Sequence, residues 1–249
     1  MLKRKKKTPN RDWLRVWRDI EKYVSRSEVN AATERAVARM AQVVAEKRCA
    51  FAWSGGKDSI VVGELARRAG VERGVFVHTN LEYPAFMQWV EHNIPPGVDT
   101  VNTGHGLEWL ANNPRFLFSG DSAIRSRWYS MVQNQNVLNF AKRNSFDTVF
   151  LGRRAAEGNY MRQVGPVHNC IGDWSHELVL GFVYYNALPL PPFYDWPDGF
   201  VHGTHSWSMR NSKGRSVRDV WGEIYGIDSS IVYRAARHIP SAYEFIGGD

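Results

Sequence analysis

The chain has 249 residues, of which 43% are hydrophobic, and it carries a net charge of +7. This length allows one α/β domain with a full core, or such a domain with a small extension. No apolar run approaches the roughly 18 residues of a membrane span. No apolar segment follows the charged N-terminus, as it would in a secretory signal. The two cysteines are too few for a disulfide framework or a four-cysteine metal site. We therefore expect a cytoplasmic globular protein with no membrane partner.

The positive charge is concentrated at the N-terminus. Residues 1–7 hold five basic side chains and no acid, and without these five the net charge falls from +7 to +2. We expect residues 1–10 to form a disordered basic arm. Such an arm can bind nucleic acid phosphates, or it can serve only to keep the chain soluble, and the sequence leaves both alternatives open.

Two helices are predicted between the arm and residue 47. Residues 12–24 place large apolar side chains at helical spacing, and residues 27–47 form a second segment rich in alanine and valine, with Ser27 as its candidate N-cap. We expect residues 11–47 to form an N-terminal helical extension of a nucleotide-binding domain that spans residues 48–187.

Strands then alternate with helices. The predicted strands cover 49–53, 73–78, 98–102 and 148–152, and the predicted helices cover 60–69, 83–92, 107–112, 123–143 and 176–186. This alternation predicts an α/β fold with a doubly wound, mainly parallel five-stranded sheet that binds ligands at the carboxyl ends of its strands. Residues 188–249 are expected to form a C-terminal region that is irregular at first and closes with helices over 217–225 and 229–238.

The most specific chemical signal is the loop Ser54–Ser59, with the sequence S-G-G-K-D-S. It joins an apolar strand to a helix, so its N–H groups and the helix dipole can hold a phosphate. A Walker A loop needs glycine and Ser or Thr where this chain has Phe51 and Asp58, and the dinucleotide fingerprint lacks its third glycine. A solvated turn without function is the alternative, which the strand–loop–helix context disfavours.

Two more polar clusters follow predicted strands. The first, H-T-N-L-E-Y-P, covers residues 78–84, and the second, G-R-R-A-A-E-G-N-Y-M-R, covers residues 152–162. The carboxyl ends of parallel strands face one crevice, and arginine forks suit phosphate or sulfate. Each cluster alone is more typical of a solvated turn or helix start than of a binding site, and only their convergence with the first loop indicates a shared site.

The three motifs together resemble those of the phosphoadenosine phosphosulfate (PAPS) reductase-like branch of the PP-loop ATP pyrophosphatase superfamily. The resemblance covers about residues 45–200, and it implies an adenine nucleotide α-hydrolase-like fold. In that family the second motif usually reads D-T-G-x-E-F-P and the third G-x-R-x-x-E-S-x-x-R, so the first motif is the most specific here.

The resemblance implies a set of site residues. The loop would hold the phosphates of ATP or PAPS, Asp58 is a candidate Mg²⁺ ligand, and Thr79 and Asn80 would lie near the adenosine. The residues expected to bind the nucleotide are Trp53, Ser54, Gly55, Gly56, Lys57, Asp58, Ser59, His78, Thr79, Asn80, Glu82, Gly152, Arg153 and Glu157. The residues expected to act in catalysis are Lys57, Arg153 and Arg162.

The chain also departs from the family. The Glu-Cys-Gly-Leu-His segment, whose cysteine attacks the sulfate sulfur in the reductases, is absent, and Arg127-Trp128-Tyr129 stands where iron–sulfur members carry a cysteine pair. We therefore expect no iron–sulfur cluster, but cleavage of the α–β phosphate bond of ATP with adenylation of an acceptor.

The acceptor and the partners stay open. The basic arm makes a nucleic acid or a nucleotide a reasonable acceptor, and a second copy of the chain in a homodimer is a further candidate partner. Two alternative functions also remain. One is a PAPS-binding reductase or sulfotransfer enzyme that acts through Cys170, and the other is a non-catalytic nucleotide-binding sensor or partner subunit.

Overall fold

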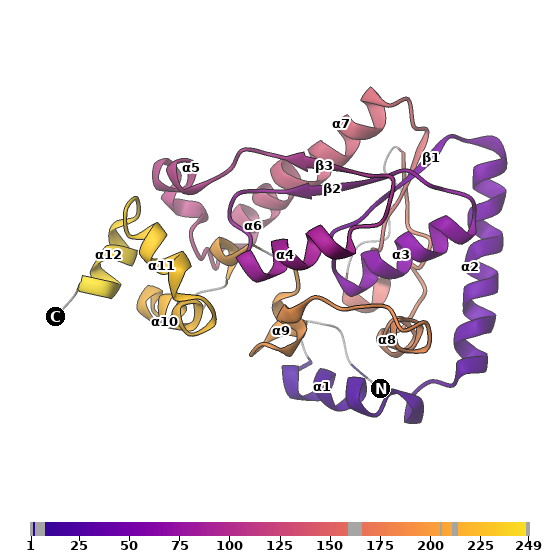
Figure 1. Ribbon diagram of the computed structural model, residues 1–249, viewed down its shortest axis with the longest axis horizontal. Helices are drawn as coiled ribbons and strands as arrows, with labels where there is room; N and C mark the ends of the chain where they lie inside the picture. Colours follow the sequence, from indigo (N-terminus) through magenta and orange to yellow (C-terminus); the bar gives the residue numbers. More distant parts are fainter. Residues whose placement is uncertain (1, 3–7, 159–165, 205, 211–213, 248–249) are drawn as a thin grey trace. The chain divides into compact units, whose positions relative to one another are not determined.

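The computed structural model describes residues 2, 8–158, 166–204, 206–210 and 214–247 (Figure 1). The chain divides into two compact units, each built from several segments. The first unit is Met1–Phe76, Trp89–Val101 and Val137–Thr204, and the second is Val77–Gln88, Asn102–Asn136 and His205–Asp249. The domain boundaries at residues 10, 47 and 187 stay predictions. Among the described residues, no helix has the length and apolar character needed to cross a membrane.

A parallel sheet of five strands carries the fold, as the sequence predicts. Its strands are β1 (Cys49–Ala52), β2 (Gly74–His78), β3 (Val98–Asn102), β4 (Thr148–Phe150) and β5 (Val167–His168), in the order β3-β2-β1-β4-β5. Phe51 in β1 is paired with Gly74 of β2 on one side and with Phe150 of β4 on the other. The predicted fold class is confirmed. The chain runs outward from β1 to β3 and then returns to β4, so the strand order reverses between β1 and β4.

Helices α1 (Asn10–Arg18), α2 (Arg26–Glu46), α3 (Lys57–Arg68), α8 (His176–Tyr185) and α9 (Gly199–His202) belong to the first unit, and α7 (Gln135–Arg143) has all but its first two residues there. Helices α2, α3 and α8 pack against one another, and α1 packs against α9. Helix α4 (Pro84–Asn93) has residues in both units. A buried face of α1 carries Trp13 and Val16, which explains the helical spacing of large apolar residues in this segment.

Two boundaries in the N-terminal helices differ from the predictions. The helix predicted over 12–24 ends at Arg18, and a 3₁₀ turn follows over Ile20–Lys22. The N-cap of α2 is Ser25, because Ser25 and Glu28 form a reciprocal capping box. Ser27 was expected in this role, but it lies inside the first turn. The prediction of Ser27 as N-cap is therefore wrong.

The second unit contains α5 (Leu107–Asn112), α6 (Ser122–Tyr129), α10 (Val217–Ile227), α11 (Ser229–Ala235) and α12 (Pro240–Gly247). The single helix predicted over 123–143 is interrupted by a π-helical turn at Ser130–Asn134, between α6 and α7. Helix α12 follows the two predicted closing helices and was not anticipated. Trp221 of α10 is fully buried and contacts Phe118 and Trp207.

Candidate functional site

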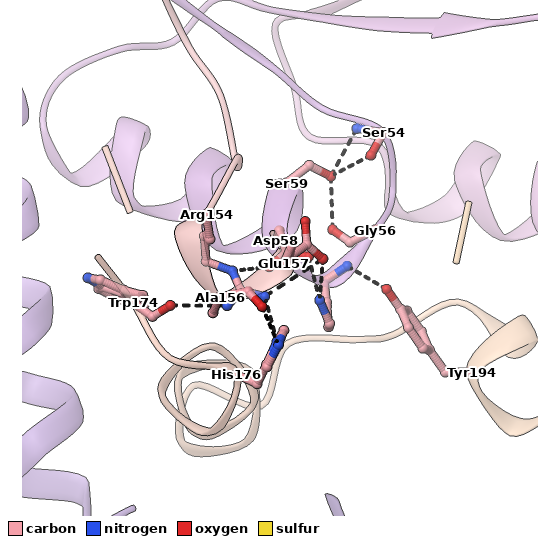
Figure 2. Close-up of polar contacts among 11 residues, drawn as sticks. Ser54, Gly56, Asp58, Ser59, Arg154, Ala156, Glu157, Trp174, His176 and Tyr194 are labelled. Carbon is pink, nitrogen blue, oxygen red and sulfur yellow. Dashed lines mark hydrogen bonds and ion pairs between the residues drawn. The ribbon is translucent and has the colours of Figure 1, made fainter. Parts of the chain in front are cut away.

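The loop Ser54–Ser59 lies between the carboxyl end of β1 and the first turn of α3 (Figure 2). Gly55 has a φ of 69°, a conformation that favours glycine. The Ser59 hydroxyl accepts a hydrogen bond from the Ser54 N–H at 2.9 Å and donates one to the Gly56 carbonyl at 2.9 Å. Gly56 caps the helix without a side chain. The loop is thus tied to the helix by Ser59, and the positive end of the helix dipole lies at the loop.

A cluster of four charged side chains, of which the two cations are buried and the two carboxylates partly exposed, lies beside this loop. Lys57 Nζ is 2.5 Å from one carboxylate oxygen of Asp58 and 3.5 Å from Glu157. Arg154 Nε is 2.6 Å from the other oxygen of Asp58. The side chains of Lys57 and Arg154 are 2% and 0% exposed. Two cations and two carboxylates therefore balance one another, as buried charges require.

His176 completes the cluster as a neutral side chain. Arg154 donates to Trp174 O and to His176 Nδ1, at 3.1 Å each, while His176 Nε2 is 3.1 Å from Ala156 O. Because Arg154 can only donate, Nδ1 accepts and Nε2 carries the proton. Burial, followed by the charges of Arg154 and Lys57, lowers the pKa of His176 to about 3. His176 thus holds Arg154 without adding charge (Figure 2).

Two aromatic side chains, Tyr194 and Trp13, contact Lys57. The hydroxyl of Tyr194 accepts a hydrogen bond from the Lys57 backbone N–H at 2.8 Å. Burial, and then the negative charge of Asp58, raise the pKa of Tyr194, so the phenol stays protonated. The ring of Trp13 lies 5.4 Å from Lys57 Nζ and 4.4 Å from the ring of His176. Trp13, His176 and Tyr194 are not among the site residues that the sequence predicts.

The residues after β4 meet the loop as expected for part of the third motif. Gly152 lies so close that a Cβ there would be 2.9 Å from the backbone carbon of Asp58, and Glu157 contacts Lys57. The guanidinium bound to Asp58 belongs to Arg154, which was not among the expected site residues. Arg153 is half-buried, and its role stays a prediction. Arg162 lies outside the described residues.

The second motif forms an ordered turn within the second unit. The Glu82 carboxylate accepts hydrogen bonds from the Thr79 N–H and hydroxyl at 2.9–3.0 Å. Asn80 accepts a hydrogen bond from Asn102 at 2.7 Å, and His78 Nδ1 lies 2.7 Å from the carbonyl of Thr79. Glu82 therefore orders this strand end. The binding of nucleotide by His78, Thr79, Asn80 and Glu82 stays a prediction.

Two other expected contacts need a rearrangement of the site. Trp53 is 3% exposed, and its ring stacks on Trp89 at 5.8 Å, so a base could reach its face only if Trp89 moved. Asp58 engages Lys57 and Arg154 with its two carboxylate oxygens. A Mg²⁺ ion bound here would have to share a carboxylate oxygen with Lys57 or Arg154, so the role of Asp58 as a metal ligand stays a prediction and we derive no step through it.

Cys170 is buried, with 2% exposure. Burial raises the pKa of its thiol to about 12. The thiol therefore stays protonated at neutral pH, whereas the thiolate is the nucleophilic form. The environment of Cys170 is therefore that of an inert core thiol.

Comparison with known proteins places these observations in a family. Residues 48–202 match the family described as the phosphoadenosine phosphosulfate reductase domain, and no curated protein matches the chain. Among solved structures, the PAPS reductase of Candida auris, a phosphate complex, is 17% identical with a TM-score of 0.48, covering 69% of this chain and 92% of its own. NMN synthetase of Francisella tularensis is 13% identical with a TM-score of 0.48, covering 86% and 95%. NH₃-dependent NAD synthetase of Campylobacter jejuni is 11% identical with a TM-score of 0.49, covering 89% and 97%.

Proposed function

Because the chain belongs to the phosphoadenosine phosphosulfate reductase domain family, as its three motifs predict, we propose that it binds ATP on the loop Ser54–Ser59. The proposed reaction is cleavage of the α–β phosphate bond, with transfer of AMP to an acceptor. The nucleotide-binding role follows from the family, and the reaction follows from the residues that this chain has and lacks.

The observation that carries the proposal is the position of the loop in the sheet. Ligands of open α/β sheets bind outside the carboxyl ends of the strands, where the strand order reverses. In this sheet the order reverses between β1 and β4. The loop follows β1, the segment with Gly152 and Arg154 follows β4, and Asp58 joins them through its ion pair with Arg154. The loop Ser54–Ser59 and a buried arginine therefore flank the position expected for a nucleotide, which supports the proposal.

The chemistry needs positioning and charge more than a nucleophilic side chain. An acceptor oxygen attacks the α-phosphorus, the bond from that phosphorus to the bridging oxygen breaks, and its electron pair leaves with pyrophosphate. Negative charge grows on the departing pyrophosphate, where the N–H groups at the start of α3 and the Lys57 ammonium would stabilise it. Lys57 would exchange its contacts with Asp58 and Glu157 for phosphate oxygens.

Nucleic acid remains our proposal for the acceptor. It rests on the basic side chains at positions 3–7, which lie outside the described residues. A reductase acting through Cys170 is not favoured, because the thiol is buried and its pKa is raised. A sensor that binds ATP without cleaving it is the alternative that the test must separate.

The test identifies which phosphate bond breaks. Purified protein is incubated with ATP labelled on the α- or the γ-phosphate, with and without RNA or single-stranded DNA. The proposal predicts release of pyrophosphate, with the α-label on the nucleic acid or in AMP. Release of ADP and phosphate would contradict it, and bound ATP with no cleavage under any condition would favour the sensor.

A further inference from the structure

The N–H that an anion would need at the start of α3 is already occupied. A helix N-terminus binds phosphate through its first backbone N–H groups. Here the Lys57 N–H donates to the Tyr194 hydroxyl at 2.8 Å, and Tyr194 is 5% exposed. The phenol oxygen thus takes a place that suits a phosphate oxygen.

The Lys57 ammonium is also closed off. Lys57 is 1% exposed, and its ammonium forms ion pairs with Asp58 and Glu157. The centroid of the Trp13 ring lies 5.4 Å from Nζ. A lysine that binds a nucleotide phosphate must reach solvent or ligand. In this arrangement the lysine reaches neither, because the two carboxylates and the ring of Trp13 surround its ammonium.

The covering side chains form one connected body, made of helix α1 and residues 192–202, which we call the cover. Trp13 and Phe200 stack at 5.6 Å with 4° between their planes, and Phe200 meets Tyr194 at 4.7 Å. Asn10 joins the two segments by accepting a hydrogen bond from the Phe200 N–H at 3.0 Å. Gly199 allows the close approach within the second segment, since a Cβ there would lie 1.9 Å from the Phe193 carbonyl. The two segments of the cover are therefore tied to each other by ring contacts and by one hydrogen bond.

We propose that the cover is an autoinhibitory device, and that it must move away from the loop before an anion reaches Lys57. The closed state competes with phosphate for the same N–H group and the same ammonium. Nucleotide affinity is then reduced by the fraction of molecules that are closed. The identity of the anion as ATP rests on the proposed function, whereas the closed state of Lys57 does not.

The first test measures access to Lys57 without any nucleotide. The protein is treated briefly with a limiting amount of acetic anhydride, and acetylation of each lysine is measured by peptide mass spectrometry. Trp13→Ala should raise the rate of acetylation of Lys57 at least several-fold, with the rates of the other lysines unchanged.

Trp17→Ala is the matched control, because Trp17 lies on the same helix and contacts Tyr184 instead. Asn10→Ala, which removes only the tie between the two segments, should act in the same direction if Trp13→Ala does not fold. Equal acetylation of Lys57 in all folded variants would overturn the proposal.

The second test measures the competition for the helix N-terminus. Tyr194→Phe keeps the ring and removes the hydroxyl, so the closed state loses one hydrogen bond, which corresponds to an about five-fold tighter apparent Kd for ATP. Unchanged or weaker binding of ATP by this variant would overturn the competition. If the cover variants expose Lys57 but no variant binds ATP, the cover stands and the proposed function fails.

Discussion

Removal of the Arg154 guanidinium should destabilise the fold far more than removal of the Arg153 guanidinium. Arg154 is 0% exposed and bonds three partners, namely Asp58, Trp174 O and His176 Nδ1. Arg154→Met keeps the length of the side chain but leaves the Asp58 carboxylate without its arginine and two acceptors without donors. Breaking one side of a buried ion pair costs about 3–5 kcal/mol. Arg153→Met is the matched control, because Arg153 is only half-buried.

Thermal unfolding gives the comparison directly. For a chain of this size, 1 kcal/mol corresponds to about 2–4 °C in Tm, so Arg154→Met should lower Tm by about 6–20 °C. Arg153→Met should lower it by no more than about 4 °C, since substitutions of partly exposed side chains usually cost less than about 1 kcal/mol. Circular dichroism on both variants would show the difference. Equal Tm values for the two variants would refute the buried network described around Asp58.

Three further predictions concern the same region. Since His176 has a pKa of about 3 in the fold against 6.5 in the unfolded chain, its contribution to stability is complete above pH 6.5 and is lost as the pH falls toward 3. The free energy of unfolding of the wild-type protein should fall by about 2 kcal/mol through this group between pH 7 and pH 5. Urea titrations should show that His176→Gln lacks this share of the pH dependence. Identical pH profiles for the two proteins would contradict a neutral imidazole at position 176. Gly152→Ala should cost about 1–3 kcal/mol by overpacking against the start of α3, whereas Gly226→Ala, with no atom within 4 Å of its added Cβ, should be neutral or stabilising in the same urea titration. Iodoacetamide at pH 7.5 should label the half-buried Cys49 before Cys170, which should react only on unfolding; rapid labelling of native Cys170 would restore the thiol-based alternative.

Local sequence signals account for much of the fold. The alternation of strands and helices is sufficient for the sheet, because apolar strands such as β1 and β4 are followed by Gly-rich or polar turns. Strand β5 has two residues, too few to show any alternation. The capping box of α2 can be recognised in the sequence, because Ser25 stands three residues before Glu28. The sequence prediction chose Ser27 as the N-cap instead. The π-helical turn at 130–134 leaves no periodicity signal of its own.

The candidate site was less accessible to sequence reasoning. The loop Ser54–Ser59 can be recognised from the sequence alone, because its glycines, serines, lysine and aspartate are consecutive residues. The choice between Arg153 and Arg154 depends on the direction of each side chain in a turn that has no periodicity. Tyr194 lies 137 positions from Lys57, and its contact exists only after the two segments pack. Long-range contacts of this kind carry no local pattern.

The most direct test of the central claim is the binding of ATP to the loop, measured by isothermal titration calorimetry. Lys57→Met keeps the bulk of the side chain and removes its charge, so it should weaken ATP binding by at least about ten-fold, because a charge-assisted phosphate contact is worth about 1.5–3 kcal/mol. Lys22→Ala is the control, since Lys22 is 75% exposed and paired with Asp19, and it should bind ATP as wild type does. If Lys57→Met binds ATP as tightly as Lys22→Ala, the loop does not hold the nucleotide and the account is wrong.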